Sequence, residues 1–351
     1  MEKNRNSNIE LLRLVLMFMV VLLHFNNDTM GGAFVYARNF PTENFVLHFL
    51  ESLSVCAVNC FMIVSGYFLY TNRRIKFSKV ADILLIVVFY RFLNYLMQIV
   101  FLREPVSVKH LIALFLPMNY FAIFYVICYM FSPFAAKMWN DLDNRKSDIL
   151  VSLLLSIFVV VPTLLDISEN VNLKIAASLS PISTVGNGGG YTIVQFFVML
   201  SLGMWLRKRK FAPKANMLLG FYIGSSLIMT LLIKMLPSLY NYCSIFTVIT
   251  AVCIFLLFNK MKMQNRALNF CSKSCFAIFC IHTGGFANTL WKKYLITEGH
   301  FTTGFANTLF WAFVSVIAMF FACLVLSVLC RLFFGKIKEK ICGALPEIRC
   351  D

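Results

Sequence analysis

The chain has 351 residues, of which 60% are hydrophobic and 14% charged, and its formal net charge is +16. A soluble domain carries nearly twice that share of charge, so the composition excludes a globular domain with one anchor and predicts a polytopic membrane protein. An excess of Lys and Arg is also typical of proteins that bind nucleic acid. Cytoplasmic loops of membrane proteins are enriched in the same residues, however, so we expect no nucleic-acid partner. Membrane lipid and an anionic cosubstrate are the partners that such a surface attracts.

Hydropathy predicts an all-α bundle of about ten transmembrane helices. The first apolar run has no small-residue cleavage site after it and is interpreted as a retained helix, not a signal peptide. The fifth segment is short and the ninth is interrupted by Thr283, Gly284 and Gly285, so nine or eleven spans are alternatives. The predicted segments are 9–27, 45–70, 80–102, 110–134, 149–165, 191–206, 216–236, 242–258, 275–296 and 305–331.

The positions of the basic residues predict that both termini lie in the cytoplasm. With ten spans, 23 of the 32 Lys and Arg residues fall in inner segments and six in outer segments. This bias sets the orientation of multi-pass proteins. No segment is large enough for a separate soluble domain, so we predict one membrane-embedded domain over 1–351, with a basic cytoplasmic tail from about 332.

The first helix carries two ionisable residues, Arg13 and His24, eleven positions apart. On a helix they share one face and lie about 16 Å apart along the axis. Such groups inside a membrane are costly and mark a functional site by default. Arg13 lies towards the cytoplasm, where it either snorkels to the interface or meets a phosphate or pantetheine group. His24, in a low-dielectric site, is a candidate general base.

Two acidic residues flank this pair. Glu10 is three residues before Arg13, a spacing that permits an ion pair. Asp28 is four residues after His24 and could orient its imidazole if the helix continues; alternatively, Asp28 caps the outer end and a loop begins at Asn26 and Asn27.

The second span contains a buried amide, Asn59, which must find a partner, and Ser65-Gly66, small residues that let membrane helices approach closely. A basic cluster follows it directly. The cluster is explained either by the positive-inside rule or by a dock for an anionic cosubstrate. Its members are Arg73, Arg74, Lys76 and Lys79.

Three further side chains are candidates for a cavity lining. Tyr125 and Tyr129 are four residues apart and share a helix face in mid-span. His282 is a second intramembrane histidine, either structural or lining the site.

The twelve cysteines lack zinc-site spacing, and we predict no metal site and no disulfide framework. The outer segment 166–190 ends in a glycine-rich run, interpreted as a flexible turn or as the lip of a substrate opening.

Together these motifs resemble the membrane-bound acyltransferase-3 family, which includes O-acetyltransferases of bacterial surface polysaccharides. The resemblance extends from residue 5 to about 330. Met62 stands where the family usually has Phe, and the basic loop lacks the family's Arg-x-x-Arg spacing. The matching stretches are Ile9 to Arg13 with Arg13-x10-His24, Asn59 to Tyr67, Arg73 to Lys79, Tyr129 to Pro133, Phe197 to Arg207, and Ser274 to His282.

The resemblance implies an integral membrane acyltransferase of the bacterial inner (cytoplasmic) membrane. Its cosubstrate would be acyl-CoA, most simply acetyl-CoA, with no permanently bound cofactor. The acceptor would be a hydroxyl of a cell-surface or lipid-linked saccharide, and the reaction would be O-acetylation in polysaccharide biosynthesis. The family roles that carry over are His24 as catalytic base, or in an acyl relay, and Arg13 as the acyl-CoA contact.

From these observations we predict the following site. Its catalytic residues are His24, Arg13 and Asp28; its acyl-CoA contacts are Arg13, Arg73, Arg74 and Lys79; and its substrate-lining residues are Glu10, Asn59, Ser65, Tyr125, Tyr129 and His282. The alternative function is a transporter or exporter of a small anionic metabolite. Paired broken helices in inverted repeats would indicate a transporter, and the sequence shows none.

Overall fold

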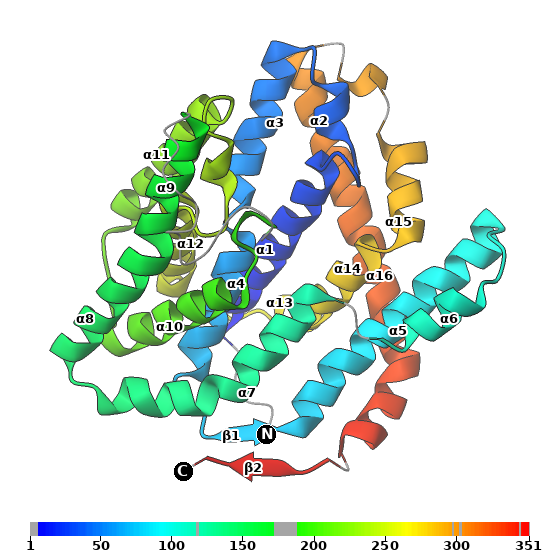
Figure 1. Ribbon diagram of the computed structural model, residues 1–351. Helices are drawn as coiled ribbons and strands as arrows, with labels where there is room; N and C mark the ends of the chain where they lie inside the picture. The colour runs from blue at the N-terminus through cyan, green and yellow to red at the C-terminus, as the bar shows by residue number, and fades with distance from the viewer. Residues whose placement is uncertain are drawn as a thin grey trace. The chain divides into compact units, whose positions relative to one another are not determined.

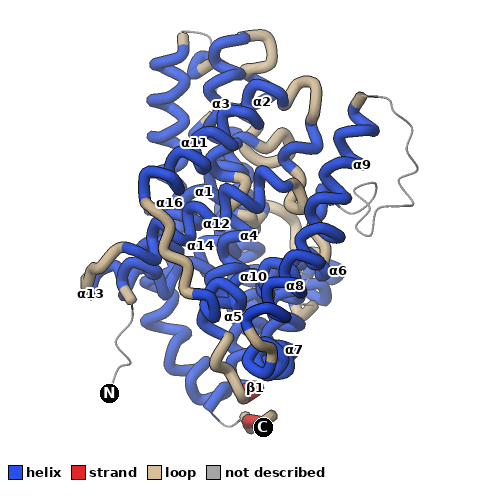
Figure 2. Tube along the Cα trace, turned by 90° about the vertical axis from the view of Figure 1, so that its left-hand side faces the viewer, coloured by secondary structure: helices blue, strands red, loops and turns tan. Residues whose placement is uncertain are grey.

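The computed structural model describes residues 6–116, 119–171, 188–296, 298–301, 304–343 and 345–350. The described chain is almost entirely helical, as the tube in Figure 2 shows, and two short strands interrupt it. Eight described helices are long and apolar enough to cross a membrane, which confirms the polytopic helical class. They are Ser7–Asn26, Pro41–Leu69, Phe77–Leu102, Tyr120–Asp141, Asn144–Asn170, Ala215–Leu232, Pro237–Lys260 and Phe305–Gly335.

The other two predicted spans are also present as helical segments, although they are shorter. One is α10 (Ile193–Arg209), with 17 residues. The second is divided into α14 (Cys275–His282) and α15 (Gly285–Leu290), and the division falls where Gly284 and Gly285 interrupt the apolar run. The prediction of a single helix over 110–134 is wrong, because α6 (Val108–Leu114) ends at Leu114 and α7 begins only at Tyr120. The sequence has a proline at position 117, a residue that disfavours helix before it.

The chain divides into two compact units, each assembled from separate stretches of sequence. The first unit comprises Met1–Leu47, Lys76–Val126 and Asn265–Ile348. In it α1 packs against α13, α14 and α16, while α5 packs against α14, α15 and α16 (Figure 1). Its helices are α1 (Ser7–Asn26), α2 (Ala33–Tyr36), α5 (Phe77–Leu102), α6 (Val108–Leu114), α13 (Arg266–Cys271), η5 (Ser272–Ser274), α14, α15, η6 (Trp291–Leu295), η7 (Glu298–His300) and α16 (Phe305–Gly343).

The second unit comprises His48–Ile75, Ile127–Gln264 and Arg349–Asp351. In it α4 packs against α10 and α12, and α11 packs against α12. Its helices, with α3 and α7 shared between the units, are α3 (Pro41–Ser54), α4 (Ala57–Leu69), α7 (Tyr120–Asp141), α8 (Asn144–Leu155), η1 (Ser156–Val160), α9 (Val161–Asn170), η3 (Gly188–Gly190), α10, α11 (Ala215–Leu232), η4 (Pro237–Tyr240) and α12 (Ile245–Lys260).

Glycines bring α4 and α10 of the second unit into backbone contact. A Cβ at Gly66 would lie 2.0 Å from the carbonyl oxygen of Leu200, and a Cβ at Gly203 would lie 2.2 Å from that of Ile63. Neither clash can be relieved by a side-chain rotation, because the atoms met belong to the backbone. The prediction that Ser65-Gly66 allows a close helix approach is confirmed.

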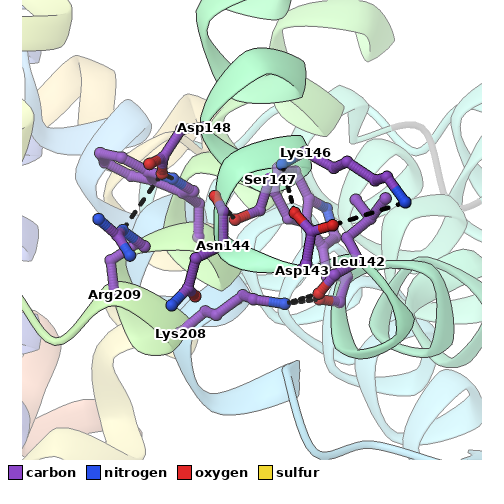
Figure 3. Close-up of polar contacts among 10 residues, drawn as sticks. Leu142, Asp143, Asn144, Lys146, Ser147, Asp148, Lys208 and Arg209 are labelled. Atoms are coloured by element: carbon purple, nitrogen blue, oxygen red, sulfur yellow. Dashed lines mark hydrogen bonds and ion pairs between the residues drawn. The ribbon is translucent and has the colours of Figure 1, made fainter.

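The basic end of α10 is tied to its neighbours on the predicted inner side (Figure 3). Lys208 donates from Nζ to the carbonyl oxygens of Trp139, at 2.8 Å, and Leu142, where α7 ends. Arg209 pairs with Asp148 of α8 at 3.2 Å. The cations therefore stabilise a helix C-terminus and bind a carboxylate, in addition to following the positive-inside rule.

The stretch 332–351, predicted as a basic tail, is mostly regular structure. Helix α16 continues to Gly343, and β2 (Glu347–Arg349) then pairs with β1 (Arg74–Lys76). Lys338 of α16 forms an ion pair with Asp82 of α5 at 2.6 Å. The end of α16 and the start of α5 thus lie together, in agreement with the predicted placement of both on the inner side. The single domain over 1–351 stays a prediction.

Candidate functional site

His24 and His282 form a hydrogen-bonded pair inside the first unit. His24 Nδ1 lies 2.7 Å from His282 Nε2, and the ring centres are 4.8 Å apart. His282 is fully buried, whereas His24 keeps intermediate exposure. Among the described residues His24 Nε2 has no hydrogen-bond partner. We call these two residues the histidine pair.

Helices α1 and α14 run in the same direction, because α1 has polar contacts near both ends of α14. At the start of α1, the Ser7 hydroxyl donates to Asn269 Oδ1 of α13 at 2.9 Å, shortly before α14 begins. At the end of α14, His282 reaches His24. Arg13 and His24 are about 16 Å apart along α1, so α14 covers most of the distance between them.

The predicted Glu10–Arg13 pair is present, with 3.4 Å between Arg13 Nη1 and Glu10 Oε1. The Glu10 carboxylate is almost buried, while the Arg13 side chain is 36% exposed. Apart from this pair, no hydrogen bond of the Arg13 guanidinium is found within the described residues. Its remaining donors are therefore available to a planar anion.

Asp28 does not orient His24. Helix α1 ends at Asn26, where the amide of Gly31 donates to the carbonyl of His24 at 2.9 Å and turns the chain back. Asp28 lies exposed in this turn. Of the two alternatives for Asp28, the loop beginning after the helix is the one observed, and the partner of His24 comes from α14.

An aromatic row connects the histidine pair to the basic start of α5. The Phe279 ring lies 5.9 Å from His282 and 6.4 Å from His24, and it also lies 5.8 Å from the ring of Phe121. Phe121 stacks on Tyr125 at 6.3 Å, and the Lys79 ammonium lies 5.8 Å from the centre of the Tyr125 ring. Lys79 and Tyr125, predicted separately, are thus neighbours.

Asn59 and Ser65 belong to the second unit, where their polar atoms contact backbone carbonyls. Asn59 Nδ2 donates to the carbonyl of Tyr242 at 2.7 Å, and Gln195 Nε2 donates to the same oxygen at 2.8 Å. The Tyr191 hydroxyl also bonds that of Tyr242. We call these four residues the Tyr242 cluster. Ser65 donates to the carbonyl of Phe61, within its own helix, at 2.8 Å.

The remaining predicted residues are also in the second unit. Tyr129 is buried on α7, and Arg74 is exposed on β1. Arg73 donates to the neighbouring carbonyl of Asn72 at 3.3 Å. The described residues contain no group of three or more His, Cys, Asp or Glu that could hold a metal ion.

The glycine-rich outer run is described only from residue 188, and the rest of the predicted lip, 172–187, lies outside the described residues. Gly189 and Gly190 have φ of +65° and +86°, a conformation that favours glycine. A Cβ at Gly190 would lie 2.9 Å from the amide nitrogen of Cys243. These two glycines are therefore explained by the backbone conformation and by packing.

Sequence reasoning missed the contact between His24 and His282, and with it the roles of Phe279 and Phe121. A helical period relates residues on one helix only, and it cannot show which helix packs beside it. The available signal was the presence of two intramembrane histidines, each in a matching family motif.

The fold and the site define a polytopic helical membrane protein with a hydrogen-bonded imidazole pair and a partly exposed arginine on α1. The chain matches the acyltransferase-3 family model, described as an acyltransferase domain, over residues 6–328. The chain belongs to this family, and the protein is a membrane acyltransferase. No curated protein and no solved structure matches it.

Proposed function

We propose that this acyltransferase moves an acyl group, most simply acetyl, from cytoplasmic acyl-CoA to a hydroxyl of a cell-surface or lipid-linked saccharide. Its place would be the bacterial inner membrane. The observation that carries the proposal is His24 on α1, whose Nε2 has no hydrogen-bond partner among the described residues. Family membership supports acyl transfer, and a general base is what an alcohol needs to attack a thioester.

In the proposed reaction, His24 Nε2 takes the proton of the acceptor hydroxyl while its oxygen attacks the thioester carbonyl carbon. A tetrahedral oxyanion forms and then collapses, breaking the carbon–sulfur bond. The proton on Nε2 passes to the departing CoA thiolate. The products are an O-acyl ester and CoA thiol, so no other reactant is consumed.

The donor would reach His24 from the inner side. Arg13 has guanidinium donors with no partner among the described residues except Glu10. Lys79 and Tyr125 begin the aromatic row that ends at the histidine pair. The distance of about 16 Å from Arg13 to His24 is compatible with a pantetheine arm between them. We assign Arg13 and Lys79, both of the first unit, to the phosphates. Arg73 and Arg74 belong to the second unit and stay contacts predicted from the sequence.

For the acceptor, we propose Tyr125 as a lining residue, because it lies on the aromatic row that reaches the histidine pair. Tyr129, buried in the second unit, stays a prediction from the sequence. Glu10 is assigned to holding Arg13, because its carboxylate is buried and paired with that guanidinium. Asn59 and Ser65 are assigned to helix packing, because their donors end on backbone carbonyls. The saccharide would therefore be recognised by few polar contacts near His24.

The test uses the purified protein in lipid nanodiscs, with [¹⁴C]acetyl-CoA and a lipid-linked oligosaccharide. We expect label on the saccharide that mild alkali releases, as for an O-ester. His24→Ala should abolish it, whereas His110→Ala, a change at an exposed histidine of α6, should not. Full transfer by His24→Ala would overturn the role of the base. No label, together with uptake of a small anion by proteoliposomes, would favour a transporter.

A further inference from the structure

The hydrogen bonds of His282 determine which nitrogen of His24 carries a hydrogen. His282 Nδ1 lies 2.7 Å from the carbonyl oxygen of Ile278, one turn earlier on α14. A carbonyl oxygen only accepts, so this Nδ1 carries the hydrogen. A neutral imidazole has one N–H, and His282 Nε2 must therefore be an acceptor.

The same reasoning passes to His24. His24 Nδ1 faces His282 Nε2 at 2.7 Å, and since that atom accepts, His24 Nδ1 must donate. The hydrogen of a neutral His24 is then on Nδ1, and Nε2 keeps its lone pair. This is the tautomer that a base acting through Nε2 requires. The assignment follows from the partners of the two rings.

The end of α14 is held in place by α5. Asn94 Nδ2 donates to the carbonyl of Cys280 at 3.4 Å, among the last carbonyls of α14, and to the carbonyl of Tyr90 at 3.0 Å. A Cβ at Gly284 would lie 2.0 Å from Asn94 Oδ1. The glycine after the helix end thus lets α14 finish against Asn94, with His282 as its last residue.

We infer that His282 is a positioning residue that holds His24 in the tautomer with a free Nε2 lone pair. The inference rests on the proposed function, in which His24 Nε2 is the base. In hydrolytic triads a carboxylate orients the histidine. Here the neutral imidazole of His282, hydrogen-bonded to the Ile278 carbonyl, takes the position of that carboxylate. In the described part of the chain, neither ring forms an ion pair with a carboxylate.

Two amide variants separate positioning from packing. In His282→Gln the side-chain oxygen can reach the position of Nε2 and accept from His24 Nδ1. In His282→Asn the shorter amide can still donate to the Ile278 carbonyl, but it does not reach His24. We expect kcat to fall on the order of 10²-fold or more in His282→Asn, with KM for acetyl-CoA unchanged, and to stay within about tenfold of wild type in His282→Gln.

A spectroscopic measurement tests the inference without activity. ¹⁵N NMR of histidine-labelled protein in bilayers distinguishes a protonated from an unprotonated ring nitrogen, and His24→Ala identifies the signals. We expect a protonated Nδ1 and a bare Nε2 on His24 in wild type and in His282→Gln, and a mixture of tautomers in His282→Asn.

The outcomes distinguish the two proposals. Equal activity of the Asn and Gln variants, or a hydrogen on Nε2 of wild-type His24, would overturn the positioning role. If wild type transfers no acetyl group, the proposed function fails, while the NMR tautomer still decides the assignment. Thermal melting of each variant shows whether a loss of kcat reflects unfolding.

Discussion

The histidine pair and the Tyr242 cluster each contain polar side chains buried in membrane helices, but the two groups use their hydrogen bonds differently. In the Tyr242 cluster, Asn59 and Gln195 donate to one backbone carbonyl, and two hydroxyls bond each other. In the histidine pair, one ring nitrogen has no partner in the described residues. The first arrangement joins segments of the second unit, and the second leaves a group available for chemistry.

The comparison teaches that a polar residue inside a membrane is not by itself a sign of catalysis. The hydrogen-bond partners of the residue decide whether it serves packing or chemistry. A donor bonded to a backbone carbonyl replaces the water that lipid cannot supply. An imidazole that is hydrogen-bonded through one ring nitrogen leaves its other nitrogen available to a substrate. Substitutions in the two clusters should therefore separate activity from stability.

The largest effect is expected at His24. His24→Ala should lower acetyl transfer on the order of 10²–10⁴-fold, the range for loss of a general base. The melting temperature should change little, because the ring keeps partial exposure and its only hydrogen-bond partner in the described chain is His282. Transfer and melting are measured on the same nanodisc sample. A larger loss of activity from any Tyr242-cluster variant would break the comparison.

The next effect is expected where α4 crosses α10. Gly66→Ala places a methyl group 2.0 Å from a backbone oxygen, and overpacking of this kind costs about 1–3 kcal/mol. The matched control is Gly220→Ala on α11, where a Cβ meets nothing within 4 Å. Melting in detergent should fall for the first variant only. Equal melting of both would show that the crossing is not tight.

Loss of one donor in the Tyr242 cluster should cost less. Asn59→Leu removes the 2.7 Å hydrogen bond to the Tyr242 carbonyl. Side-chain hydrogen bonds in membranes average about 0.6 kcal/mol, with a maximum of about 1.7 kcal/mol. The melting temperature should drop slightly, while acetyl transfer per folded molecule stays unchanged. If the Asn59→Leu protein is fully folded but inactive, Asn59 belongs to the functional site and not only to helix packing.

The smallest effect is expected at Asp143, outside the membrane (Figure 3). Its side chain accepts from the Lys146 amide at 2.7 Å and caps α8, which lowers the pKa of the carboxyl below its usual 3.8. The lowered value means that stability from this group is present above pH 3.8 and is lost as the pH falls through the folded-state pKa. As the pH falls below 4, the melting temperature of Asp143→Asn should therefore decrease less than that of wild type, and we expect the difference to be small.

Much of the fold follows from the sequence because burial in lipid demands long apolar runs. All ten apolar segments are found as helices or helical pieces, and the interruption at Gly284 and Gly285 is a true helix break. The break between α6 and α7 was missed because a hydropathy window averages over a short polar or proline-containing step. The end of α1 at Asn26, which leaves Asp28 in a turn, lay within the error of any boundary estimate.

The site could be predicted only in part. The Glu10–Arg13 pair is local, and its spacing alone implied it. The neighbours Lys79 and Tyr125, and above all His24 and His282, are brought together by packing between distant segments. That packing is set by the shapes of many side chains at once, as for Gly284 against Asn94, and no single spacing in the sequence records it.

The separation of His24 and His282 by 258 residues has a consequence for biogenesis. During synthesis α1 is made well before α14. In the proposed mechanism, a nascent chain therefore carries the base His24 before the imidazole that orients it has been made. In the proposed mechanism the oriented base forms only once α14 has been inserted beside α1, so we expect an incompletely inserted chain to consume little acyl-CoA.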